Sequence, residues 1–295
     1  MKNKLKVGIL GTGNIGTDLL IKIQRSEYIE CSIFAGRNLA SLGMSKAASM
    51  GTRLSDEGID AFVREPSICD IVFDATSAKS HLTHAPILKD LGKFVIDMTP
   101  AKIGLLCVPA VNLEEAVAVE NVNMITCGGQ ASIPIAYAIS QAHPEIEYIE
   151  TISTISSRSA GPGTRINIDE YIDATEKGLK IFSGAKETKA MLNLNPAIPA
   201  IDMQTTVMAE IKKPNVKRIV EEVEKMLLEI QKYVPGYQMV VAPTLDDNRM
   251  QITVRVQGLG DYLPKFAGNL DIINCAAIEV AERFAQKHFI GASDE

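Results

Sequence analysis

Short apolar runs alternate with helical stretches through the first hundred residues, and this alternation restricts the possible fold more than any other feature. The runs are LKVGIL, IECSIFAG, DIVFD and KFVID, and helical stretches follow from Asn14, near Ala40 and after His81. Strands joined by helices form parallel sheets, because a crossover helix returns the chain to the same edge. A further apolar run, VNMIT, ends at Cys127. The sequence therefore predicts an α/β protein with an N-terminal Rossmann-like parallel sheet.

A second domain is expected after His143, where EIEYIETISTIS alternates apolar and polar residues as a half-exposed antiparallel strand does. Further strands are expected around AMLNL, TTVMAEI, QMVVA and QITVRV, with a Gly/Pro loop, SSRSAGPGTR, and an amphipathic helix from Val216 to Tyr233. We expect residues 131–267 to form an α+β domain with a mostly antiparallel sheet. Residues 1–130 form the first domain, which the C-terminal helix at 268–295 is expected to join.

The composition excludes several classes of partner. Of the 295 residues, 46% are hydrophobic and 22% charged, a balance that supports a sizeable core. The net charge of -6 and the lack of a basic stripe argue against nucleic acid. No apolar run reaches the roughly 18 residues of a membrane helix, and MKNKLKVGILG breaks at glycine too early for a signal peptide. We therefore expect a cytoplasmic protein that binds no membrane.

The cysteines and histidines show no pattern typical of a metal site. The five cysteines are scattered, with no CxxC pair, and no clustered acidic or cysteine ligands follow His81 and His84. These two histidines are expected to be polar residues at the start of a helix. No bound metal is expected.

A glycine-rich loop follows the first strand directly. It has the GxGxxG pattern, whose glycines allow a tight turn and a close backbone approach, while N–H groups at the helix start attract a pyrophosphate. We therefore expect this loop to bind a dinucleotide. The loop consists of Gly11, Thr12, Gly13, Asn14, Ile15 and Gly16.

The end of the second strand bears on the choice of cofactor. NAD-binding proteins usually carry an acidic residue there, which binds the ribose 2′-hydroxyl, but this chain has Ala35-Gly36-Arg37-Asn38. Arg37 could pair with a 2′-phosphate, or it could be a solvated side chain. The sequence is thus compatible with NAD and with NADP.

Cys127 differs from the other cysteines because it ends a strand, precedes Gly128 and Gly129, and opens a helix. Unpaired N–H groups and the helix dipole lower a thiol pKa at such a place, so we expect a reactive thiolate. Beside a nicotinamide, a thiolate can attack an aldehyde, form a hemithioacetal, and become a thioester once the hydride leaves. His143 lies too far along the same helix to act as its local base. Buried structural cysteine is the alternative interpretation.

Several segments together resemble one known family, the acylating acetaldehyde dehydrogenases that partner 4-hydroxy-2-oxovalerate aldolases in catabolic pathways, including aromatic hydrocarbon catabolism. The similarity spans nearly the whole chain. It is carried by KVGILGTGNIGTDL, FDATSA, IDMTPAKIG, CVPAVNLEE, NMITCGGQASIP, SSRSAGPGTRINIDEY and YLPKFAGNLDI.

The resemblance implies that Cys127 forms the acyl thioester, that coenzyme A accepts the acyl group, and that the substrate is a small aldehyde, acetaldehyde or propanal. It also implies NAD as the cofactor, a catalytic and dimerisation role for the second domain, and a homodimer or a heterotetramer with the aldolase. By the same resemblance, further residues surround the cofactor; taken alone they would be a flexible loop and a helix N-cap. They are Ser159, Ala160, Gly161, Pro162, Gly163, Thr164, Arg165, Ile166, Asn167 and Asn269.

The chain departs from the family pattern in two places. The family usually has an aspartate, taken as a general base, where this chain has Thr205, and Asp202 lies three residues earlier, on the opposite face of an expected strand. The segment between Tyr237 and Tyr262 is shorter than usual. These departures leave the general base and the pocket contacts open.

Two other functions remain possible from the sequence alone. A semialdehyde dehydrogenase of amino-acid biosynthesis shares the two-domain plan and uses phosphate in place of coenzyme A. A non-catalytic dinucleotide-binding partner of an aldolase would need no reactive thiol.

Overall fold

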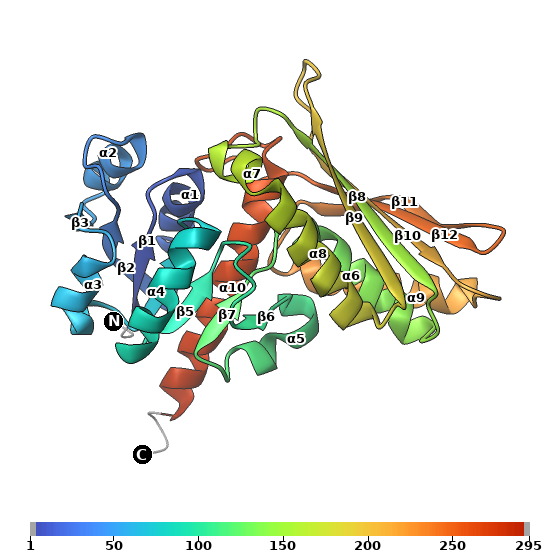
Figure 1. Cartoon of the computed structure of the whole chain (residues 1–295), viewed down its shortest axis with the longest axis horizontal. Coiled ribbons are helices and arrows are strands. Elements are labelled where there is room, and N and C mark those ends of the chain that lie inside the picture. Colours follow the sequence, from blue (N-terminus) through green and yellow to red (C-terminus); the bar gives the residue numbers. More distant parts are fainter. Residues whose placement is uncertain (1–3, 292–295) are drawn as a thin grey trace. The chain divides into compact units, whose positions relative to one another are not determined.

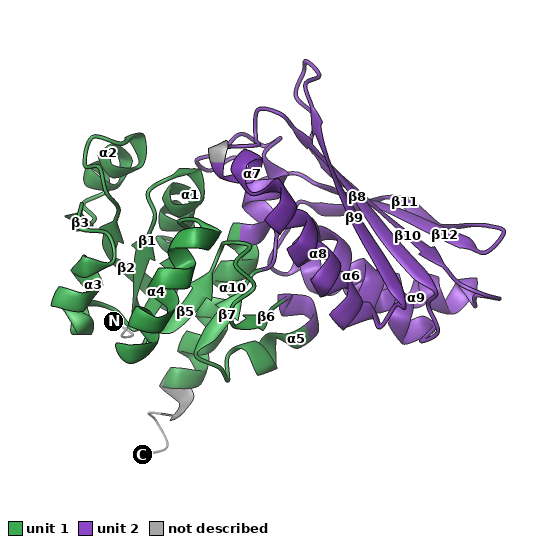
Figure 2. Ribbon diagram, viewed as in Figure 1, with its two compact units in different colours: residues 1–107, 112–124, 274–295 green, residues 108–111, 125–273 purple. Residues whose placement is uncertain are grey.

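The chain divides into two compact units in the computed structural model, which describes residues 4–291 (Figures 1 and 2). Unit 1 comprises residues 1–107, 112–124 and 274–295, and unit 2 comprises residues 108–111 and 125–273. Unit 1 is therefore built from both ends of the chain. Among the described helices, none combines the length and apolar content needed to cross a membrane.

Unit 1 contains a seven-stranded sheet in the order β3-β2-β1-β4-β5-β7-β6, and every strand pair in it is parallel. From β1 the order runs to β2 and β3 on one side and to β4 and β5 on the other, as in doubly wound dinucleotide-binding folds, and β7 then lies between β5 and β6. The predicted Rossmann-like sheet is confirmed. Its strands are β1 (Leu5–Leu10), β2 (Ile29–Ala35), β3 (Leu54–Ser55), β4 (Ile71–Asp74), β5 (Phe94–Asp97), β6 (Leu105–Leu106) and β7 (Asn121–Asn123).

Helices cover this sheet, and the last of them comes from the C-terminal end of the chain. The ring of Phe284 stacks on Phe94 of β5 at a centroid distance of 4.0 Å, and the Asn274 side chain donates to Asp18 at 2.8 Å. The C-terminal part of α10 thereby completes the core of unit 1. The helices are α1 (Asn14–Ile23), α2 (Leu42–Ser49), α3 (Asp60–Arg64), η1 (Pro66–Ile68), α4 (Ala78–Asp90), α5 (Pro109–Ala116, from residue 112 on) and α10 (Gly268–Gly291, from residue 274 on).

Unit 2 contains a five-stranded sheet in the order β11-β12-β10-β8-β9. Only the pair β8 and β9 is parallel, so the prediction of a mostly antiparallel sheet is confirmed. The strands are β8 (Tyr148–Ser156), β9 (Glu187–Asn195), β10 (Met203–Glu210), β11 (Tyr237–Asp246) and β12 (Arg249–Val256). The helices are α6 (Cys127–Ala142), α7 (Pro162–Ile166), α8 (Ile168–Ser183), α9 (Val216–Gln231) and the first residues of α10.

Alternation along β10 sets which side chains enter the core of unit 2. Met203, Thr205, Val207 and Ala209 are buried, whereas the residues between them keep exposure, as the period of two in a strand requires. Helix α6 packs against this strand, and the buried phenol of Tyr237 donates to the Ala131 carbonyl of α6 at 2.7 Å. Thr205 therefore faces the helix layer.

Three local features differ from the sequence-based prediction. The strand β7 ends at Asn123, because Ile125 has a φ of 63°, which interrupts an extended run. The expected Gly/Pro loop contains the short helix α7, and the 16-residue helix α8 that follows it was not predicted. Signals for α8 are present: Asp169 and Glu170 lie in its first turn, and Gly184 ends it with a φ of 67°.

Candidate active site

The glycine-rich loop of unit 1 has the geometry of an anion-binding turn. Gly11 has a φ of 113°, and a Cβ there would lie 2.5 Å from the Ala75 carbonyl oxygen. A Cβ at Gly16 would collide with the Gly11 carbonyl, so only glycine lets α1 approach the turn. A Cβ at Gly13 would meet nothing within 4 Å, and no side chain caps α1. The first amides of α1, including those of Asn14 and Ile15, are thus available to a pyrophosphate.

The end of β2 lies beside this loop within unit 1. A Cβ at Gly36 would lie 2.6 Å from the Thr12 methyl group, and the Thr12 hydroxyl is 3.4 Å from the Ser41 hydroxyl that caps α2. Arg37 follows Gly36 and is exposed, and no carboxylate of the described residues pairs with it. The structure therefore brings Thr12 and the strand end together and leaves the Arg37 guanidinium available to a ligand.

Cys127 is the first residue of α6 in unit 2. The hydroxyl of Thr126, the N-cap residue, accepts a hydrogen bond from the Gly129 N–H at 2.8 Å and lies 2.7 Å from the Thr175 hydroxyl. Burial raises the pKa of the Cys127 thiol to about 11, while Tyr171 and the backbone amides of Gly128 and Cys127 act in the opposite direction. The expectation of a lowered thiol pKa is therefore wrong for this state, because desolvation outweighs the helix N-terminus.

The hydroxyl groups of three buried residues form a chain of contacts that begins at the Cys127 thiol. The Cys127 Sγ lies 3.9 Å from the Tyr171 Oη, the Ser153 hydroxyl is hydrogen-bonded to the Tyr171 phenol, and the Ser153 Oγ lies 3.0 Å from the Thr205 Oγ1. Tyr171 was not found by sequence reasoning, because α8 was not predicted. Asp202 does not join this set, since it precedes β10 and accepts a bond from Gln257 at 3.4 Å.

The residues expected around the cofactor in unit 2 fall on one loop, on α7 and on α10. The Asn269 side chain donates to the Ser159 carbonyl at 3.5 Å, and its Oδ1 is buried without a hydrogen-bond partner among the described residues. Asn269 lies inside α10, not at its N-cap, because the helix begins at Gly268.

The loop and α7 are held by local hydrogen bonds. Arg165 donates to the carbonyls of Ala160 and Ser157 at 3.1 and 2.9 Å, and the Asn167 side chain donates to the Gly163 carbonyl at 2.6 Å. Ser159 and Ala160 are buried. Gly161 is the N-cap of α7, Pro162 its first residue, Thr164 half-buried, and Ile166 exposed.

A buried acid–imidazole cluster lies at the carboxyl ends of β4 and β5 in unit 1. His81 Nδ1 and His84 Nδ1 each lie 2.8 Å from the same Asp74 oxygen. Burial acts to raise the pKa of Asp74, but the hydrogen bonds from His81, His84 and Thr76 together lower it to about 2. Burial raises the pKa of Asp97 to about 6, against the effect of His81. Within residues 4–291, no group of His, Cys, Asp and Glu could hold a metal ion.

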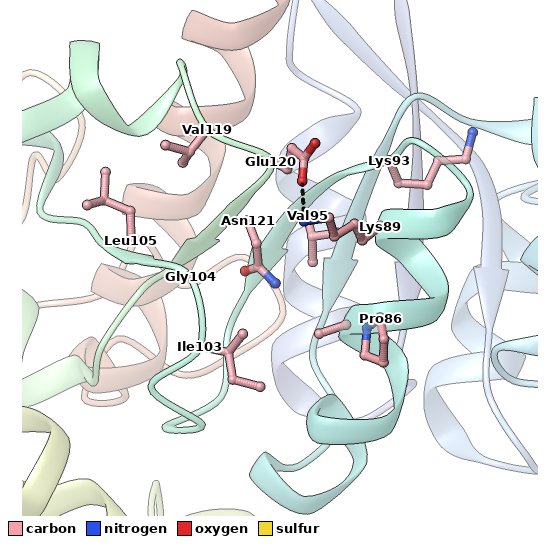
Figure 3. Close-up of a pocket in the computed structure, with 11 residues that line it drawn as sticks. Pro86, Lys89, Lys93, Val95, Ile103, Gly104, Leu105, Val119, Glu120 and Asn121 are labelled. Carbon is pink, nitrogen blue, oxygen red and sulfur yellow. Dashed lines mark ion pairs between the residues drawn. The ribbon is translucent and has the colours of Figure 1, made fainter.

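A cavity of about 460 Å³ opens elsewhere in unit 1, between α4, β5 and the β6–β7 edge (Figure 3). Its lining is mainly apolar, with Val95, Ile103 and Leu105 among the contributing residues, and the Lys89–Glu120 ion pair at 3.4 Å lies at its side. None of the expected site residues lines it.

A parallel dinucleotide-binding sheet followed by a second, mostly antiparallel sheet is the fold that this chain shares with a solved semialdehyde dehydrogenase. A crystal structure of aspartate semialdehyde dehydrogenase II from Vibrio cholerae superposes with a TM-score of 0.66 at 16% identity, covering 97% of this chain and 100% of that one; this likeness shows the fold alone. The model of the semialdehyde dehydrogenase NAD-binding domain matches residues 6–119, and that of the prokaryotic acetaldehyde dehydrogenase dimerisation domain matches residues 127–264.

Comparison with relatives of nearly equal length identifies the family within this class of enzymes. An acetaldehyde dehydrogenase of Pectobacterium atrosepticum is 60% identical over 98% of both chains. One of Spirochaeta aurantia is 56% identical over 96% of this chain and 95% of its own, and one of Geobacillus stearothermophilus is 47% identical over 98% and 99%. The chain belongs to the acetaldehyde dehydrogenase family. The resemblance found in the sequence is confirmed at this level, and the chain is an oxidoreductase with an NAD-binding domain.

Proposed function

We propose that this chain is an acylating acetaldehyde dehydrogenase, which oxidises acetaldehyde or propanal with a nicotinamide cofactor and passes the acyl group from Cys127 to coenzyme A. The observation that carries the proposal is the position of Cys127 as the first residue of α6, with Gly128 beside it. There the sulfur adjoins backbone amides that favour its ionised form. Membership of the acetaldehyde dehydrogenase family supports the aldehyde substrate.

The residues of unit 1 fit a dinucleotide. The glycine loop offers unblocked backbone amides at the start of α1, which suit a pyrophosphate, and Arg37 is available to a ribose or to a 2′-phosphate. In unit 2 the buried Asn269 Oδ1 lacks a partner among the described residues and would accept a hydrogen bond from the cofactor. We assign cofactor binding to these groups and to the segment from Ser159 to Asn167. When bound, the cofactor supplies the hydride acceptor.

Cys127 acts as the nucleophile in this proposal. Its thiolate adds to the aldehyde carbonyl and gives a hemithioacetal, and loss of hydride from that carbon leaves a thioester. The thiol of coenzyme A then loses its proton to solvent, its sulfur attacks the thioester carbonyl, and the Cys127 sulfur leaves as a thiolate. The acyl group is thus transferred, and the enzyme returns to its starting state.

A homodimer through unit 2 is part of the same proposal. The matched dimerisation model spans residues 127–264. The face of the sheet opposite the buried row of β10 carries apolar side chains. Ile152 of β8 pairs with Thr206 of β10, Met208 of β10 pairs with Glu150 of β8, and both apolar residues are half-exposed. A second copy of the chain would bury Ile152 and Met208.

We further propose a 4-hydroxy-2-oxovalerate aldolase as a partner, giving a heterotetramer in the cytoplasm. Size-exclusion chromatography alone and with that aldolase tests both assemblies, and separate elution at micromolar concentration would exclude a stable complex with the aldolase.

A spectrophotometric assay tests the activity. Acetaldehyde and propanal are each combined with NAD or NADP, with and without coenzyme A, and reduction of the cofactor is followed. We expect turnover that requires coenzyme A, and an acyl adduct on the Cys127 peptide when coenzyme A is withheld. Turnover with phosphate in place of coenzyme A would indicate a semialdehyde dehydrogenase type of reaction, and no turnover or adduct would indicate a non-catalytic dinucleotide-binding protein.

A further inference from the structure

The phenol of Tyr171 occupies a recess beside the proposed nucleophile. Tyr171 lies in the first turn of α8, is buried, and places its Oη 3.9 Å from the Cys127 Sγ. The recess exists because residue 128 is glycine: a Cβ there would collide with the Tyr171 Oη and would lie 2.9 Å from the Ser153 Oγ. The contact between phenol and thiol is therefore built into the packing of α6, α8 and β8.

The hydroxyl groups behind the phenol allow an order of donors that ends at the sulfur. In the neutral state the Cys127 thiol donates to the phenol oxygen, and ionisation of the thiol reverses this bond. Ser153 is hydrogen-bonded to the Tyr171 phenol, and Thr205 lies 3.0 Å from Ser153. Each hydroxyl has one proton to donate. When Thr205 donates to Ser153 and Ser153 donates to the phenol oxygen, the phenol proton points to the sulfur. All three hydroxyl groups belong to buried residues, so water does not compete at these positions.

We propose that Tyr171 is a further catalytic residue, whose phenol donates a hydrogen bond to the Cys127 thiolate and so stabilises the nucleophile, while Ser153 and Thr205 act as positioning residues for the phenol. The proposal rests on the proposed function, because it assigns a role in activating the same sulfur. The thiol proton leaves to solvent, since the hydroxyl chain contains no base. The phenol keeps its own proton throughout.

The surroundings of the sulfur make such a donor necessary. The groups that act on the ionisation of the thiol are the Tyr171 side chain and the backbone amides of Gly128 and Cys127, and burial opposes them. The neighbouring polar side chains from β8 and β10, Ser153 and Thr205, are uncharged. The acidic residues near Tyr171 on α8, namely Asp169, Glu170 and Asp173, are exposed. In such an environment a charge-assisted hydrogen bond raises the thiolate population by about one to two decades at fixed pH.

The test is the pH dependence of Cys127 alkylation by iodoacetamide in the resting enzyme, read from the Cys127 peptide by mass spectrometry. Tyr171→Phe should move the midpoint to higher pH by about one unit or more, with an alkylation rate at pH 8 lower by about tenfold or more. Thr205→Val should move it the same way by less. The matched control is Tyr137→Phe, which removes a phenol from α6 itself and should leave the midpoint unchanged.

An unchanged midpoint in a folded Tyr171→Phe protein would overturn the proposal. If that variant does not fold, Ser153→Ala and Thr205→Val give the same readout, and two unchanged midpoints there would overturn it equally. Alkylation needs neither aldehyde nor coenzyme A. A failure of the proposed function, seen as turnover that survives Cys127→Ser, is therefore distinguishable from a failure of this inference.

Discussion

His81 Nε2 lies 3.4 Å from the Asp97 Oδ2, and both side chains are fully buried in unit 1. The other ring nitrogen of His81 contacts Asp74, so one imidazole bridges two carboxyl groups. Asn123 donates to the same Asp97 oxygen at 2.6 Å. Burial acts to raise the pKa of both acids; it prevails at Asp97, whose pKa is raised to about 6, whereas the hydrogen bonds from His81, His84 and Thr76 prevail at Asp74, whose pKa is lowered to about 2.

The raised pKa of Asp97 gives a pH dependence of stability with a definite sign. Between about pH 4 and pH 6 the folded state holds a proton that the unfolded chain has released, so this contribution to the free energy of unfolding falls as pH rises. The expected loss is about 1 to 3 kcal/mol across that window. Asp74 acts in the opposite sense, but only below about pH 4, since its folded pKa is lowered.

Urea unfolding at pH 4.5 and 6.5 measures this effect. Asp97→Asn should flatten the dependence relative to the unchanged protein, because the group that titrates is gone. Asp56→Asn, at an exposed position, should leave the slope as it was. An identical slope in the Asp97 variant would show that its carboxyl group does not titrate in this range.

Cys127→Ser should abolish coenzyme A-dependent oxidation and leave NAD affinity within about threefold, since a hydroxyl is a far weaker nucleophile than a thiolate at neutral pH. Activity assays and a binding titration separate the two effects. Cys69→Ser is the matched control: Cys69 is buried in the core of unit 1, so that change should lower stability only, with activity per folded molecule nearly unchanged. Substantial turnover by the Cys127 variant would contradict the mechanism.

Arg37→Ala should weaken NADP binding by about ten- to hundredfold and NAD binding much less, because only NADP has a 2′-phosphate that a guanidinium can pair with. Fluorescence titration with each cofactor gives the two affinities. Lys6→Ala removes an exposed positive charge near the amino end of β1 and should change neither. Equal losses for both cofactors in the Arg37 variant would assign that residue to the adenine pocket or to the fold.

Gly128→Ala should reduce turnover by at least about tenfold, because the added Cβ would take the space of the Tyr171 Oη. Turnover and thermal unfolding are measured together. In Gly178→Ala, on α8, the new Cβ would meet the terminal methyl of Ile133 at 2.7 Å, and this flexible group can move. We expect the Gly178 variant to keep activity within about twofold. Normal turnover by the Gly128 variant would show that the recess tolerates a methyl group.

Local sequence signals were sufficient for the fold class and for the position of Cys127 at the start of a helix. The LKVGIL run coincides with β1, and the glycine loop falls between that strand and α1, because turn geometry and amide exposure are properties of a few adjacent residues. The thiol pKa was predicted in the wrong direction, since it depends on burial by distant segments. Tyr171 lies 44 residues from Cys127, and no spacing rule connects them. The Gly/Pro-rich segment directly before α8 is typical of a loop, so the sequence did not predict the helix that contains Tyr171.

The division of unit 1 between the two ends of the chain has a consequence during synthesis. The ribosome synthesises residues 125–273 before residue 274. Nearly all of unit 2 can therefore fold during translation, before the last helix of unit 1 has been made. Until then Phe94 of β5 lacks the Phe284 ring that stacks on it in the finished protein, and this part of the core of unit 1 remains open to water. The nascent chain thus exposes apolar surface from the synthesis of unit 1 until the last helix is made, and a chaperone can bind it during this period.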